Sequence, residues 1–131
     1  MSDGGLTPDE FHQENAVAVA DGMEVRLADD RHLLLDLDDE AAIARFAKYR
    51  PKLTDLFGAT LVEEYESRSG PGHLHVILEL AEPHPAAFRI ALQAVLGSDP
   101  LRELLGLRRL ANGVTEPSRL FRKRERTDEA A

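Results

Sequence analysis

The sequence contains no cysteine, and this absence removes two kinds of chemistry. Without thiols the chain forms no disulfide and offers no thiolate to a metal ion. It also lacks a run of the roughly 20 apolar residues that a membrane-spanning helix needs. The N-terminal residues MSDGGLTPDEFHQENA lack the basic and then apolar pattern of a signal peptide. We therefore expect a cytoplasmic protein that does not interact with a membrane.

Basic residues are scarce, and lysine is the scarcest of them. The chain has 24 acidic and 16 basic residues and a net charge of −8, which disfavours non-specific nucleic-acid binding by the whole surface. Arginine supplies 13 of the basic residues and lysine 3. Arginine holds phosphate in a bidentate manner more readily than lysine does, but a GC-rich or salt-adapted genome gives the same bias. The arginine excess alone therefore does not indicate a phosphate-binding protein.

The pattern of apolar residues predicts one domain of helices and strands. The chain has 131 residues, of which 43% are hydrophobic, enough for a single core. We expect a tail over residues 1–15, one domain over 16–124 and a second tail over 125–131. Residues 16–22 read as extended chain. Further strands are predicted at 23–28, 32–38, 59–67, 73–81 and 118–124, and helices at 39–57, 82–97 and 99–110.

From residue 32 onward this order matches the ferredoxin-like, or RRM-like, split βαβ fold (βαββαβ), with one short extra helix. In that α+β fold four antiparallel strands lie in the spatial order 4-1-3-2, and the helices cover one face. Residues 23–28 would add an extra N-terminal strand, paired as a hairpin with 32–38. The strands at 32–38 and 73–81 would be the antiparallel neighbours at the centre of the sheet.

Polar residues interrupt these two central strands at the ends that the fold brings together. Asp36 and Asp38 close the first strand, and His73 and His75 open the second. Residues two apart share a face of a strand, and directly opposed Cβ atoms lie about 4.5–5.5 Å apart. With the neighbouring leucines turned toward the helices, the two carboxylates and two imidazoles should cluster on the open face of the sheet.

Two carboxylates on one face repel each other unless a cation lies between them. Mg²⁺ and Mn²⁺ prefer oxygen ligands, and Mg²⁺ commonly combines one or two carboxylates with substrate phosphates. Such ions can stabilise the attacking and leaving oxygens of phosphoryl transfer, and a neighbouring histidine can hold a phosphate oxygen. The pattern therefore predicts a metal and phosphate site. The alternatives are that Asp38 only caps the next helix and that the histidines are solvated surface residues.

These motifs resemble those of the archaeo-eukaryotic primase superfamily, the primase-polymerases. Members share an RRM-like catalytic unit with a DxD or DxE pair, a small-residue-x-His element and a third acidic residue. Asp36 and Asp38 match the first motif, and His75 in SGPGHLH (69–75) matches the second. The resemblance covers residues 32–124. The family usually carries a further N-terminal α/β unit, which is too long for the segment before Asp36, so the match is to a minimal or degenerate member.

The resemblance implies nucleotidyl transfer from a nucleoside triphosphate on a DNA or RNA template, in the replication of a virus, a plasmid or an archaeal host. Mg²⁺ or Mn²⁺ would be the cofactor, and other replication proteins would be partners. Asp99 is the best candidate for the third acidic residue, although it also fits a helix N-cap before Pro100. The implied catalytic residues are Asp36, Asp38, His75 and Asp99, of which the three aspartates bind metal. The implied nucleotide- and phosphate-binding residues are Ser69, His73, His75, Arg108 and Arg109.

The same histidines support a second hypothesis. HLH (73–75) is a His-hydrophobic-His element and resembles that of HUH-type replication initiators and relaxases, in which histidines bind a metal and a tyrosine attacks the phosphate. His84 would be a third ligand. No tyrosine follows residue 65, and Tyr65 is predicted on a strand, so Tyr49 is the nucleophile to test.

A third hypothesis is a non-catalytic ferredoxin-like interaction module. RNA-binding sheets of this type usually stack bases on aromatic residues of the central strands. The segments 32–38 and 73–81 contain no aromatic residue other than histidine, so base stacking is not expected. A protein-interaction role stays open.

Overall fold

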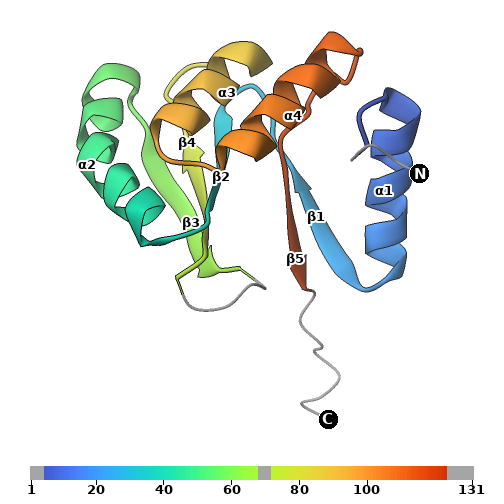
Figure 1. Ribbon diagram of the computed structural model, residues 1–131. Helices are drawn as coiled ribbons and strands as arrows, with labels where there is room; N and C mark the ends of the chain where they lie inside the picture. The colour runs from blue at the N-terminus through green and yellow to red at the C-terminus, as the bar shows by residue number, and fades with distance from the viewer. Residues whose placement is uncertain (1–4, 68–71, 124–131) are drawn as a thin grey trace.

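A computed structural model describes residues 5–67 and 72–123 (Figure 1). Within these ranges the chain is an α+β protein with four helices and five strands in two small antiparallel sheets. No helix in the described part of the chain is long and apolar enough to cross a membrane. The larger sheet has the order β2 (His32–Leu37), β4 (Leu74–Glu79), β3 (Thr60–Glu66), and the smaller one pairs β1 (Met23–Leu27) with β5 (Arg119–Lys123).

Three helices lie on one side of the sheets, and a fourth lies beside β1 (Figure 1). They are α2 (Glu40–Phe57), α3 (Ala86–Val95), α4 (Pro100–Ala111) and α1 (Pro8–Ala20). The leucines of β2 at odd-numbered positions face α2 and α3, as the two-residue period of a strand predicts. The buried residues of this core are Leu33, Leu35, Leu37, Phe46, Leu53, Ala59, Val76, Leu78, Leu80, Leu92 and Leu96.

The N-terminal segment differs from the prediction. Residues 8–20 form α1, whereas the sequence predicted a tail up to residue 15 and extended chain after it. A capping box begins the helix: the Thr7 hydroxyl accepts from the Glu10 amide, and the Glu10 carboxylate accepts from the Thr7 amide. Phe11 is buried, and the guanidinium groups of Arg109 and Arg119 lie over its ring. The cap and this burial outweigh the strand preference of the alternating valines, since local propensity is weak.

The predicted hairpin between β1 and β2 is wrong. β1 pairs along its length with β5, from Met23 opposite Lys123 to Leu27 opposite Arg119. β2 pairs instead with β4. The expected strand order is therefore shown only in its β2-β4-β3 part.

Side chains from α3 and α4 occupy the edge of β2 that lies opposite β4. The Leu34 amide donates to Gln93 Oε1 at 2.9 Å, and the Leu34 carbonyl accepts from Arg102 Nη1 at 2.9 Å. Arg102 also donates from Nη2 to the carbonyl of Arg119 on β5 at 3.0 Å. Its guanidinium therefore lies between β2 and β5 and replaces the backbone hydrogen bonds that would join them. This substitution explains why two sheets form, because every buried backbone group needs a partner.

The face of the larger sheet that carries Asp36 and His75 is only partly open. Leu34 and Ile77 pack there in a second cluster with Ala28 and Leu120. The prediction of an uncovered face is thus wrong for the middle of the strands, where β5 and the residue after β1 cover it. Asp36 lies nearer the end of β2, and its side chain is 25% exposed.

Candidate metal centre

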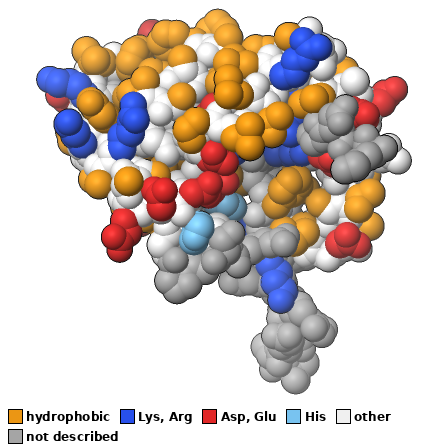
Figure 2. Space-filling model, in the orientation of Figure 1, with side chains coloured by type: hydrophobic (Ala, Val, Ile, Leu, Met, Phe, Trp, Pro, Cys, Tyr) orange, Lys and Arg blue, Asp and Glu red, His pale blue; other side chains and the backbone are white. Residues whose placement is uncertain are grey.

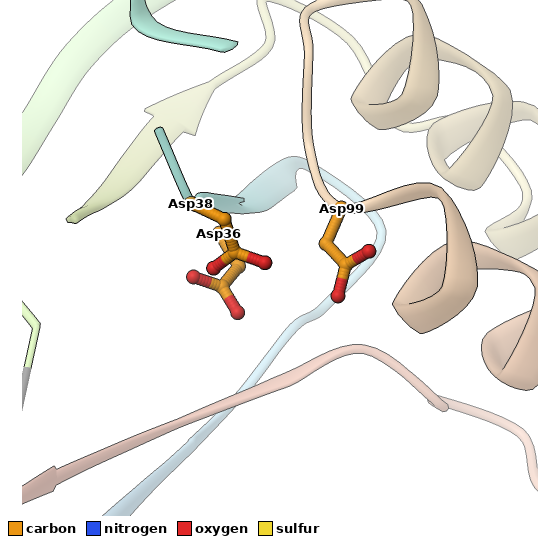
Figure 3. Close-up of side chains that lie close together, drawn as sticks. All are labelled: Asp36, Asp38 and Asp99. Carbon is orange, nitrogen blue, oxygen red and sulfur yellow. The ribbon is translucent and has the colours of Figure 1, made fainter. Parts of the chain in front are cut away.

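Three aspartates meet at the end of β2 (Figure 3). Asp36 belongs to β2, Asp38 follows it, and Asp99 precedes α4. One carboxylate oxygen of each lies within 4.8 Å of the others. Among residues 5–67 and 72–123, no other group of three histidine, aspartate or glutamate side chains meets this spacing. The structure therefore brings together the three residues that the sequence nominated as metal ligands.

Asp38 is not the cap of α2. That role belongs to Asp39, whose Oδ1 accepts from the Ala42 amide at 2.8 Å. Asp38 Oδ1 instead lies 3.8 Å from Nδ1 of His73. The capping interpretation of Asp38 is wrong, and its carboxylate belongs to the cluster.

Asp99 has two roles at once. It is the N-cap of α4, and its Oδ1 accepts from the Leu101 amide at 3.1 Å. Its own amide donates to the Asp36 carbonyl at 2.9 Å. The loop before it passes so close to α2 that a Cβ on Gly97, at φ +99°, would lie 2.7 Å from the Ala42 carbonyl oxygen. Only glycine suits this position. The close contact between Gly97 and α2 therefore fixes the position from which the Asp99 side chain projects.

Both histidines lie beside the aspartates, as the predicted strand pairing requires. His75 is opposite Asp36 in the register, and its Nε2 lies 3.6 Å from Asp36 Oδ1. His75 is 8% exposed. Within the described residues, neither Nδ1 of His75 nor Nδ1 of His73 has a hydrogen-bond partner. A buried nitrogen without a partner is costly, and these two border the cluster of carboxylates.

Burial and mutual repulsion shift the pKa values of the centre. Burial, and then the charges of Asp36 and Asp99, raise the pKa of Asp38 to about 6. Burial also raises the pKa of Asp36, against the opposing charge of Arg102. Burial and then Arg102 lower the pKa of His75 to about 4. The imidazole is therefore neutral at neutral pH, the form in which histidine binds metals.

A pocket of about 470 Å³ adjoins the centre, between the end of β2, α4 and β5. Figure 2 shows acidic side chains gathered beside histidine side chains on this face. The three aspartates and His75 line one part of the pocket. Its remaining lining includes three arginines and several apolar side chains, among them Arg102, Arg109, Arg119, Leu101, Leu105 and Phe121.

The pocket arginines already bind protein groups. Arg102 donates to the Leu34 carbonyl and to the Arg119 carbonyl. Arg119 pairs with Glu14 at 2.6 Å. Arg109 is buried, and its Nε donates to the Gly5 carbonyl at 3.2 Å. A phosphate in this pocket would have to compete with these acceptors.

The other nominated phosphate-binding residues have different surroundings. Arg108 is exposed and does not line the pocket. Ser69 lies outside the described residues. His73 borders the centre through Asp38.

Ser98, Arg102 and Glu103, which were not predicted as site residues, lie behind the aspartates and hydrogen-bond to β2 or to one another. Glu103 is 4% exposed, yet Leu101 and Leu104 on the same helix are 63% and 62% exposed. α4 thus turns polar residues inward and leucines outward, against the usual amphipathic pattern. The sequence predicts Asp99 as the N-cap of α4, but the spacing of the apolar residues in α4 does not indicate that Glu103 is buried.

The structure changes which residues could serve in an HUH-type nuclease. His84 stacks on Phe88 with ring centroids 4.8 Å apart, beyond the end of β4 opposite to His73 and His75. Tyr49 belongs to α2, which packs on the other face of the sheet. Tyr65 of β3, in contrast, is opposite His75 in the register, with ring centroids 5.2 Å apart.

Comparison of the chain with protein-family models, curated protein sequences and solved structures found no match. The candidate centre therefore rests on its own geometry.

Proposed function

We propose that Asp36, Asp38 and Asp99 bind a divalent cation, Mg²⁺ or Mn²⁺. The observation that carries this proposal is the convergence of three carboxylates within 4.8 Å from two distant parts of the chain. Like charges this close are unfavourable, and more so where burial reduces solvent screening. A hard divalent cation reverses this repulsion, and three carboxylate oxygens suit its ligand preference.

We further propose that the site handles a phosphate ester, with a nucleoside triphosphate as the substrate. The pocket beside the aspartates has room for such a group, and its arginines are bound to protein acceptors. Phosphate oxygens would therefore be held chiefly through the bound cation, as is common for Mg²⁺. His75, neutral and with an unpartnered Nδ1 among the described residues, offers a hydrogen bond beside them.

The reaction class we propose is nucleotidyl transfer of the primase-polymerase kind. The resemblance of the Asp36, Asp38 and His75 motifs supports it, and so does their meeting at one end of β2 and β4. A divalent cation in such a site stabilises the charge on the attacking and leaving oxygens. The protein would supply the three carboxylates, the neutral imidazole and a pocket that orients the nucleotide next to them.

We also propose that the two sheets derive from one ferredoxin-like sheet that is opened between β2 and β5. Arg102 supports this view because it bridges the Leu34 carbonyl of β2 and the Arg119 carbonyl of β5. β5 would then take the place of the fourth strand, and β1 would extend the sheet beyond it.

Titration calorimetry with Mn²⁺ and a nucleoside triphosphate tests the proposal. We expect the parent protein to bind and Asp36→Asn to lose the binding heat. Asp55→Asn is a matched control, since Asp55 is exposed near the far end of α2 and the change in charge is the same. Equal heats from the parent and Asp36→Asn would contradict the proposal.

A second candidate function has one observation in its favour, the position of Tyr65 next to His75. An HUH-type nuclease would use the deprotonated oxygen of this tyrosine to attack a DNA phosphate. The bond from phosphorus to the 3′ oxygen of the adjoining nucleotide would break, which releases a 3′-hydroxyl and leaves the 5′ phosphate covalently bound to the tyrosine. Incubation with Mn²⁺ and single-stranded DNA, for the parent, Tyr65→Phe and Tyr49→Phe, separates the two functions. An adduct that needs only Tyr65 favours the nuclease, whereas nucleotide addition that survives Tyr65→Phe favours the primase-like activity.

A further inference from the structure

A cluster of polar side chains lies directly behind the candidate metal centre. It consists of the buried Gln93, Ser98 and Glu103 and the partly buried Arg102, and we call it the polar wedge because it lies between β2 and β5. Gln93 is 0% exposed, Ser98 1% and Glu103 4%. Polar groups buried this deeply are tolerated only when they are hydrogen-bonded, and Glu103 accepts from each of the other three.

The Ser98 hydroxyl joins the polar wedge to β2. Its Oγ donates to Glu103 Oε2 at 2.7 Å and accepts from Arg102 Nη1 at 3.1 Å. It also accepts from the backbone amide of Asp36 at 3.0 Å. One donated and two accepted bonds are the full capacity of a hydroxyl, so this oxygen has a fixed position between α4 and β2.

The wedge acts on two of the proposed metal ligands through their backbones. Ser98 Oγ holds the Asp36 amide, and the amide of the next residue, Asp99, holds the Asp36 carbonyl at 2.9 Å. Both polar backbone groups of Asp36 are thus bonded to residues 98 and 99. This double link sets how close the Asp99 carboxylate comes to the Asp36 carboxylate.

We propose that Ser98, held by the buried Glu103, is a positioning residue of the metal centre. It touches neither metal nor substrate, and it keeps Asp99 beside Asp36 in the arrangement that binds a cation. This inference rests on the proposed metal-binding function. Groups that orient metal ligands in this way commonly change metal affinity by about 10- to 100-fold when they are removed.

Ser118→Ala provides a matched control for Ser98→Ala. Ser118 is also buried, at 6% exposed, and its Oγ accepts from Gln93 Nε2 at 3.1 Å. It therefore borders the same wedge, and within the described part of the chain it has no hydrogen bond to Asp36. The two variants remove the same atom from similar surroundings, so both should lower the thermal unfolding temperature.

The first readout is Mn²⁺ binding to the folded full-length proteins by calorimetry. We expect Ser98→Ala to weaken binding by about tenfold and Ser118→Ala to leave it unchanged. Glu103→Gln, which keeps the shape of the side chain, should also weaken binding and serves if Ser98→Ala does not fold. Equal Mn²⁺ affinity in the parent and the two wedge variants would overturn the proposal, and so would an equal loss in Ser118→Ala.

The second readout needs no metal. Amide hydrogen exchange of Asp36 and Asp99 should be faster in Ser98→Ala than in Ser118→Ala. Ser98 Oγ accepts from the Asp36 amide and so supports the adjoining bond from the Asp99 amide to the Asp36 carbonyl, whereas Ser118 makes no bond to Asp36 among the described residues. Unchanged exchange in Ser98→Ala would refute the positioning role even if Mn²⁺ binds. Faster exchange together with a parent that binds no Mn²⁺ would instead refute the metal-binding function and leave the structural link intact.

Discussion

Replacing Asp38 with asparagine should stabilise the metal-free protein at neutral pH, because the carboxylate of Asp38 is unfavourable where it stands. Burial and the charges of Asp36 and Asp99 raise its pKa from 3.8 to about 6. Folded protein therefore binds this proton more tightly than unfolded protein does. As the pH rises through the range from 3.8 to about 6, the free energy of unfolding falls, and the full penalty is present above about pH 6.

The size of the effect follows from the shift and from exposure. For a group that is fully buried and not screened by solvent, a pKa shift of this size corresponds to about 3 kcal/mol. The side chain of Asp38 is 48% exposed, and solvent screening reduces the figure to about 1 kcal/mol. For a chain of 131 residues this raises the unfolding temperature by about 3–5 °C.

Thermal unfolding of the parent and Asp38→Asn, in chelator and in Mn²⁺, measures the effect. In chelator at about pH 8 the variant should be the more stable protein, and at about pH 3.5 the difference should vanish. In Mn²⁺ the order should reverse, because only the parent keeps all three carboxylates. Asp55→Asn, with the same charge change on an exposed part of α2, should show neither effect. A variant less stable than the parent in chelator at about pH 8 would refute the electrostatic account of the centre.

Three further predictions concern the same site. Mn²⁺ should raise the unfolding temperature more at about pH 8 than at about pH 5, because below about pH 6 a proton competes with the ion for the Asp38 carboxylate. An equal rise at both pH values would contradict this. Gly97→Ala should destabilise the protein by about 1–3 kcal/mol, because its Cβ would meet the Ala42 carbonyl at 2.7 Å; urea unfolding measures this, and a neutral result would show that the loop has more room. In an NMR titration His75 should stay neutral down to about pH 4; a midpoint near its ordinary value would mean that the imidazole is not buried beside Arg102.

The pairing of Asp36 with His75 could be predicted because it depends on local rules. Alternation fixes which residues share a face, and antiparallel pairing fixes which ends meet. Asp99 could be nominated for a similar reason, since α3 returns the chain to the same end of the sheet. The residues that make contact there are the ones the sequence proposed.

The partner of β5 could not be predicted in the same way. It depends on Arg102 and Gln93, which satisfy the Leu34 backbone from neighbouring helices. An arginine and a glutamine with these spacings have no signature in the periodicity. The burial of Glu103 could not be predicted either, because the leucines of α4 suggest that the opposite face of this helix is buried.

α1 was missed because two kinds of local signal disagree. The valines at 17 and 19 alternate as in a strand, whereas the Thr7 and Glu10 box marks the start of a helix. The packing of Phe11 under Arg109 and Arg119, residues about a hundred positions away, resolves the conflict in favour of the helix.

The most direct test of the three-aspartate centre is the number of Mn²⁺ ions bound by the parent and by Asp99→Asn, measured by electron paramagnetic resonance of the free ion. Asparagine is as good an N-cap as aspartate, so this variant keeps the bond to the Leu101 amide while it removes one charged ligand. The account predicts a site in the parent that is lost or greatly weakened in Asp99→Asn, with the fold intact. Identical Mn²⁺ binding by the two proteins, or none by the parent, would contradict it.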